Sequence, residues 1–121
     1  MKGLIIVGAG GFGREMFAAA REAVGYGTDF YVKGYLDARA DALDGFDGYP
    51  PIIGSPDSYV PERDDVFVTA LGAIASRRRC AETLEAKGAR FVAVVLGSST
   101  SKERDDNAAR LIADALGAID W

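Results

Sequence analysis

The stretch that decides the fold is Leu4–Gly13, which reads LIIVGAGGFG. Its first four residues form a continuous run of bulky apolar side chains, typical of a strand that is covered on both faces in a parallel sheet. The glycines that follow have the spacing G-x-G-x-x-G and stand directly before a helical pattern over 11–24. A glycine loop between a strand and a helix is typical of folds that bind phosphate groups at the helix N-terminus.

The glycine positions predict a site for an anion or a nucleotide phosphate. The first glycine allows a tight turn, the second lets a phosphate approach the backbone, and the third lets helix and strand pack closely. We expect the site to be lined by Gly8, Gly10, Gly11, Phe12 and Gly13. The alternative is a tight turn that binds no ligand.

Strand and helix patterns alternate along the rest of the chain. Strands are expected at 30–36, 66–71 and 91–96, a short extended piece at 51–54, and helices at 73–87 and within 98–121. This alternation predicts an α/β fold, a single Rossmann-like domain over 1–121 whose open parallel sheet of four or more strands carries helices on both faces. By analogy with doubly wound sheets we expect the strand order 3-2-1-4 or a close variant, with 66–71 counted as the third strand and 91–96 as the fourth.

The C-terminal segment 98–121 has the pattern of an additional amphipathic helix. Its apolar face is formed by Leu111, Ile112, Ala115 and Leu116, which recur at helical spacing. Leaving such a face in water would forgo about 1.5–3 kcal/mol for each large aliphatic side chain. We therefore expect the helix to pack on its own sheet, with a second copy or a partner as the alternative.

Three further residues are candidates for the ligand site. Asp37 ends the second strand and follows Gly13 at close to the ~20-residue spacing at which an acidic residue reaches a ribose hydroxyl, although a solvated aspartate is the alternative. Gly72 follows the strand at 66–71 and would let a base or ribose pack against the backbone. Arg77 lies near the start of the next helix, where a cation opposes the helix dipole and could instead hold a phosphate.

Composition excludes several classes of function. The chain has 121 residues, a net charge of −4, one cysteine and no histidine. The acidic balance argues against nucleic-acid binding, and no apolar run approaches the ~20 residues of a membrane span. Without histidine, a Ser-His-Asp triad and a histidine-ligated metal are excluded, so we expect no catalytic residue and no metal site. The N-terminal apolar run is too short for a signal peptide, which predicts a cytoplasmic protein.

Several segments together resemble a known domain. They are Lys2–Glu15, Gly34–Asp37, Pro51–Ser55, Phe67–Gly72 with Arg77, and Lys87-Gly88. Over about residues 1–95 the chain is similar to the N-terminal domain of bacterial sugar O- and N-acyltransferases of the sialic acid O-acetyltransferase and bacillosamine N-acetyltransferase type. The resemblance implies a Rossmann-like domain that binds a nucleotide-sugar acceptor, typically a UDP-sugar. It assigns that role to the glycine loop, Asp37, the Gly72 loop and Arg77.

The sequence also departs from that family. The family continues into a left-handed β-helix of hexapeptide repeats, which carries the acetyl-CoA site and the catalytic histidine, whereas this chain shows neither repeats nor histidine. We therefore expect no acetyl transfer by this chain alone, and a second copy or a separate β-helix acyltransferase as its protein partner. The alternatives to nucleotide-sugar binding are an NAD(P)-type dinucleotide-binding or sensor protein and a non-catalytic interaction or dimerisation module.

Overall fold

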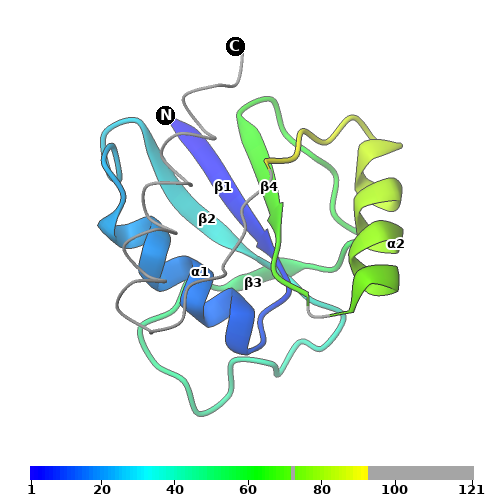
Figure 1. Ribbon diagram of the computed structural model, residues 1–121, viewed down its shortest axis with the longest axis horizontal. Coiled ribbons are helices and arrows are strands. Elements are labelled where there is room, and N and C mark those ends of the chain that lie inside the picture. The colour runs from blue at the N-terminus through cyan, green and yellow to red at the C-terminus, as the bar shows by residue number, and fades with distance from the viewer. Residues whose placement is uncertain (72, 93–121) are drawn as a thin grey trace.

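The computed structural model describes residues 1–71 and 73–92. The elements follow in the order β1 (Lys2–Val7), α1 (Gly11–Glu22), β2 (Phe30–Leu36), β3 (Ile52–Gly54), β4 (Asp65–Thr69) and α2 (Ile74–Glu85) (Figure 1). All strand pairs are parallel, and the four strands form one open sheet in the order β3-β2-β1-β4. The predicted Rossmann-like α/β fold is therefore confirmed.

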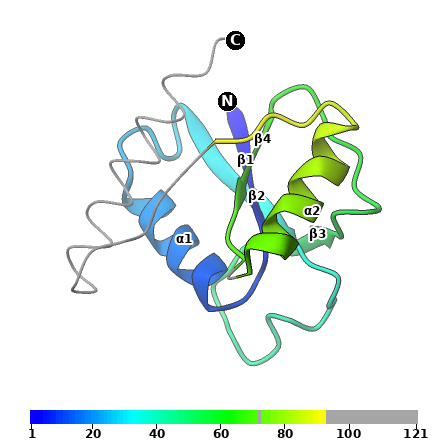
Figure 2. The ribbon, with the colours of Figure 1, turned by 45° about the vertical axis from the view of Figure 1, so that its right-hand side comes forward.

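The sheet lies between the two helices, as Figure 2 shows. Side chains of β1 alternate between the two faces because successive residues of a strand point to opposite sides. Leu4 and Ile6 belong to the cluster beneath α1, whereas Ile5 and Val7 belong to the cluster beneath α2. All four are fully buried. The continuous apolar run in the sequence thus reflects a strand with a helix on each face.

The strand order is the doubly wound one, but one strand at the edge differs from our expectation. The segment expected as the third strand, 66–71, is observed as β4 and pairs with β1, not with β2. The place beside β2 is taken by β3, the short extended piece at Ile52–Gly54. The chain can make this arrangement because the loop after β2 brings Ile52 back beside Tyr35 before the chain crosses to the far side of β1.

Several sequence predictions reach beyond the described residues. In the described part, the strand expected at 91–96 is represented by a single parallel bridge between Phe67 and Phe91. The C-terminal helix expected within 98–121 lies outside the described residues, and so does Gly72. Among the residues that are described, no helix is long and apolar enough to cross a membrane.

Candidate functional site

The glycine loop leaves β1 through a turn that only glycine makes without strain. Gly8 has a φ of +110°, in the left-handed region that side chains disfavour. A Cβ at this position would lie 2.8 Å from Cδ2 of Leu71, just beyond the end of β4. The Gly8 N–H donates to the carbonyl of Leu36 at 2.8 Å, at the end of β2. The loop therefore begins where the carboxyl ends of three neighbouring strands meet.

Gly13 allows α1 to pack directly onto the loop. A Cβ at Gly13 would overlap the carbonyl oxygen of Gly8 and would lie 3.1 Å from Cε1 of Tyr35. The Gly13 carbonyl accepts a buried hydrogen bond of 2.8 Å from the Tyr35 hydroxyl. The close helix–strand approach that the glycine spacing predicts is thus present. Tyr35, which belongs to β2, stabilises it through this hydrogen bond.

The first turn of α1 carries no side-chain cap. Gly10 is the N-cap residue, no side chain caps the helix, and the first turn contains no acidic residue. The first helical hydrogen bond joins the N–H of Arg14 to the carbonyl of Gly10 at 3.0 Å. The N–H groups before Arg14 therefore stand at the positive end of the helix without a capping side chain, an arrangement that favours anions.

Two guanidinium groups flank this turn. A Cβ on Gly10 would have Nη2 of Arg39 as its nearest neighbour, at 4.0 Å, and a Cβ on Gly11 would have Nη2 of Arg14, at 3.9 Å. Arg14 comes from α1 itself, where side chains lean back toward the N-terminus. Arg39 comes from the loop after β2. The backbone at Gly10 and Gly11 is thus approached by two cations and is not crowded by other atoms.

Exposed aromatic side chains lie next to the same turn. Cζ of Arg14 lies 3.9 Å from the centre of the Phe46 ring, a cation–π contact. Phe46 is 45% exposed and Phe12 is 47% exposed. Met16 and Phe17 fill the core from α1, whereas Phe12 is left at the surface beside the loop.

Asp37 lies against the glycine loop, with its side chain only 7% exposed. Oδ2 accepts hydrogen bonds from the N–H of Ala9 at 2.9 Å and from Nη2 of Arg39 at 3.1 Å. Oδ1 accepts from the N–H and Nε of Arg39, at 2.9 and 3.1 Å. Burial opposes the charged form, but these hydrogen bonds outweigh it and hold the pKa of Asp37 below its usual range. Asp37 is therefore a carboxylate that ties β2 to the loop.

Arg39 and Phe46 were not anticipated from the sequence. A signal for Arg39 exists: an aspartate often accepts a hydrogen bond from the backbone N–H two residues later, which turns the chain and brings that residue back toward the carboxylate. Phe46 has no comparable local signal, since it reaches α1 from within a long loop. Both residues come to the site through the loop between β2 and β3, which lies at the end of the sheet toward which the strands point (Figure 1).

Arg77 lies in α2, which begins at the same end of the sheet as the glycine loop (Figure 2). Arg77 is exposed in the first turn of α2, where its N–H bonds the carbonyl of Ala73 at 3.0 Å. Figure 2 shows the beginnings of α1 and α2 at the same end of the sheet, on opposite faces. Arg78 and Arg79 are also exposed.

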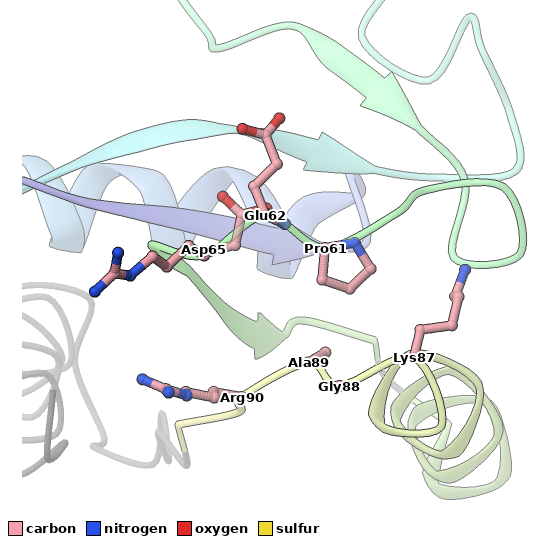
Figure 3. Close-up of a pocket in the computed structure, with 8 residues that line it drawn as sticks. Pro61, Glu62, Asp65, Lys87, Gly88, Ala89 and Arg90 are labelled. Atoms are coloured by element: carbon pink, nitrogen blue, oxygen red, sulfur yellow. Dashed lines mark hydrogen bonds between the residues drawn. The ribbon is translucent and has the colours of Figure 1, made fainter.

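A cavity of about 240 Å³ lies at the opposite end of the sheet. It is formed by the turn before β4 and the segment after α2, and it is lined by Pro61, Glu62, Arg63, Asp65, Lys87, Gly88, Ala89 and Arg90 (Figure 3). The Nζ of Lys87 donates to three backbone carbonyls, those of Pro56, Asp57 and Tyr59. Lys87 therefore stabilises the backbone of the segment 56–59.

The acidic side of that cavity is also occupied by internal contacts. Asp65, at the start of β4, is buried and pairs with Nζ of Lys33 at 2.8 Å. It also accepts hydrogen bonds from the hydroxyl of Tyr59 and the N–H of Glu62, at 2.6 and 2.8 Å. We therefore regard this cavity as a structural feature, and the glycine-loop end as the candidate site. In the described part of the chain, no three acidic or cysteine side chains form a group suited to a metal ion.

Comparison with known proteins identifies the family of the chain. No curated protein sequence matches the chain. Residues 3–84, which include the glycine loop, Asp37, Arg39 and most of α2, match the model of the PglD N-terminal domain. This match covers well over half of the chain, so the resemblance to PglD/NeuD-type sugar acyltransferases is confirmed at the level of the family. The chain belongs to the PglD N-terminal domain family.

Proposed function

We propose that the chain binds a nucleotide-sugar of the UDP-sugar class at the loop between β1 and α1. The observation that carries the proposal is the open first turn of α1, with the guanidinium groups of Arg14 and Arg39 beside Gly11 and Gly10. A diphosphate offers several acceptor oxygens and more than one negative charge, which suits guanidinium donors and backbone N–H groups together.

Two further features support a ligand that carries a base and a sugar. Phe12 and Phe46 expose aromatic rings beside the turn, and stacking of a nucleobase on such a ring is worth about 1–3 kcal/mol. Membership of the PglD N-terminal domain family relates the chain to sugar acyltransferases. The proposal includes binding in the cytoplasm, and it includes Asp37, Gly72 and Arg77 as outer members of the site.

The proposal is tested by thermal unfolding with UDP, UDP-N-acetylglucosamine, NAD(H) and coenzyme A in parallel. A ligand that binds only the folded state stabilises it by about 2.7 kcal/mol at one hundred times its Kd, which raises the melting temperature by several degrees. We expect this shift with the uridine nucleotides. A shift with NAD(H) alone would replace the proposal by dinucleotide binding, and no shift with any of them would favour an interaction module.

A variant at the loop locates the binding. Gly10→Val fills the open space at the first turn, since only Arg39 comes within 4.0 Å of a Cβ there, so the fold is expected to persist while the nucleotide shift is lost. Ala86→Val is the matched control, because it adds similar bulk at an exposed helix end on the opposite side of the sheet. Unchanged nucleotide affinity in Gly10→Val would count against the site.

A further inference from the structure

The hydrogen bonds of Asp37 leave little room for a ribose. Its two oxygens accept four hydrogen bonds, one from Ala9 and three from Arg39. An ionised carboxylate offers about four lone-pair sites, so this set occupies its capacity. The side chain is also 7% exposed. A ribose hydroxyl could bond Asp37 only by displacing Arg39 or by breaking the contact with the glycine loop.

Arg39, in contrast, has guanidinium N–H donors that its pair with Asp37 does not use. A guanidinium group carries five N–H donors in a rigid planar fork, and the pair with Asp37 uses one on Nε and one on Nη2. The side chain is 65% exposed, and its Nη2 lies 4.0 Å from the position of a Cβ on Gly10. The second N–H of Nη2 therefore stands beside the backbone at the first turn of α1, where the glycine spacing predicts a phosphate.

The pairing with Asp37 holds this group in place before any ligand arrives. A free surface arginine would lose rotamer freedom on binding a phosphate, which weakens the binding. Here the guanidinium group of Arg39 is already oriented by two hydrogen bonds to the Asp37 carboxylate. The same carboxylate accepts a hydrogen bond from the N–H of Ala9. Asp37, Arg39 and the glycine loop thus form one connected unit.

We propose that Arg39 binds a phosphate of the ligand and that Asp37 is a positioning residue, which orients Arg39 and does not contact the ribose. This inference rests on the proposed nucleotide site and deepens it: it assigns the selection of a phosphorylated ligand to a residue outside the glycine pattern. It also gives Asp37 a role different from the one expected from its spacing after Gly13.

The test is a double-mutant cycle with UDP as the probe, measured by calorimetry on the full chain. Arg39→Ala is expected to weaken UDP binding about 10- to 100-fold, the loss typical of a charge-assisted hydrogen bond. Asp37→Asn is expected to weaken it as well, but to add less than about twofold in the Arg39→Ala background, because residues that act through one another are not additive. Arg39→Lys, which keeps the charge without the fork, should fall between wild type and Arg39→Ala.

Comparison of UDP with its 2′-deoxy analogue separates the two roles of Asp37. If Asp37 positions Arg39, the preference for UDP over the deoxy compound is the same in wild type and in Asp37→Asn. Arg63→Ala is the control for loss of one positive charge, since Arg63 is exposed at the opposite end of the sheet; it should bind UDP within about twofold of wild type.

Three outcomes would overturn the inference. Wild-type affinity in Arg39→Ala would exclude a phosphate contact. Full additivity of the two substitutions, with loss of the preference for UDP in Asp37→Asn, would show that Asp37 binds the ribose directly. Absence of nucleotide binding by the wild-type chain would remove the proposed function and this inference together. If Asp37→Asn does not fold, the alanine and lysine variants of Arg39 still decide the phosphate contact.

Discussion

At the residue scale, the loop depends on the close contact between Gly13 and the backbone of Gly8. Gly13→Ala places a methyl group onto the carbonyl oxygen of Gly8, and backbone atoms are the neighbours that yield least. We expect a loss of at least about 3 kcal/mol in the free energy of unfolding, measured by urea denaturation. The start of α1 would have to move away from β1.

Gly11→Ala is the control for this prediction. Its Cβ would meet only Nη2 of Arg14, at 3.9 Å, and alanine is a better helix former than glycine. We expect a stability within about 1 kcal/mol of wild type. Equal stability of the two alanine variants would show that the packing of Gly13 on Gly8 is not a constraint on the fold.

The buried pair of Lys33 and Asp65 gives a second prediction at this scale. Asp65→Asn removes the charge that faces Lys33 Nζ at 2.8 Å in a part of the molecule where Asp65 is 3% exposed. Loss of one partner leaves the other charge poorly compensated, which we expect to cost roughly 2–4 kcal/mol in urea unfolding. Glu62→Gln is the control: its carboxylate is 72% exposed and 3.3 Å from Lys33, so its loss should cost less than about 1 kcal/mol. Similar losses of stability in Asp65→Asn and Glu62→Gln would show that the buried pair with Lys33 contributes no more than the exposed one.

At the element scale, the two helices are attached to the sheet very differently. The buried residues of α1 include Met16, Phe17, Ala19 and Ala20, whereas Leu84 is the buried residue of α2. Leu84 is fully buried and packs in the cluster of Ile5, Val7, Leu36 and Phe67. The attachment of α2 therefore depends on one large side chain near its C-terminal end.

We expect Leu84→Ala to destabilise the protein by about 2–5 kcal/mol, the range for removing a buried leucine. Hydrogen exchange should show the amides of α2 losing more protection than those of α1, since α1 keeps its own buried face. Ile74→Ala is the matched control, because Ile74 begins the same helix and is 66% exposed. A uniform loss of protection in both helices would mean that α2 does not unfold separately.

At the scale of the whole molecule, four groups among the described residues make stability sensitive to alkaline pH. Burial raises the pKa of Tyr35, that of the Cys80 thiol and, together with the hydrogen bond to Asp65, that of Tyr59. Burial opposes the charge of Lys33, but its hydrogen bonds to Asp65, Tyr59 and Glu62 prevail and raise its pKa. A pKa that is higher in the folded state contributes stability that is complete below the unfolded value and is lost as pH rises toward the folded value.

The unfolded pKa values are about 8.5 for cysteine, about 10 for tyrosine and about 10.4 for lysine. We therefore expect the free energy of unfolding to be nearly constant from about pH 7 to 8, to begin to fall above about pH 8.5 and to fall more steeply above about pH 10, by about 1.4 kcal/mol per pH unit for each group that titrates only in the unfolded chain. Urea denaturation over this range measures the slope. Tyr35→Phe should reduce the slope above about pH 10, because it removes one of the groups that titrate there. A slope unchanged by that substitution would exclude Tyr35 as a contributor.

Much of the fold followed from local features of the sequence. The apolar run at Leu4–Val7 requires cover on both faces, and the glycine spacing at Gly8 and Gly13 requires a tight turn with a close helix. Both are constraints that act within a few residues, so they are readable without knowing what lies nearby. They led correctly to a parallel sheet with helices on both faces and to a loop at the start of α1. The ligand at that loop stays a prediction.

The tertiary structure decided which distant segments meet. It placed β4 beside β1 and gave the outer position next to β2 to the short β3. It brought Arg39 to the glycine loop and paired Lys33 with Asp65 across the sheet. The physical reason is that contacts of this kind depend on the path of a long loop and on competition among many side chains for the same partners, whereas steric limits on a glycine turn are set by the turn itself.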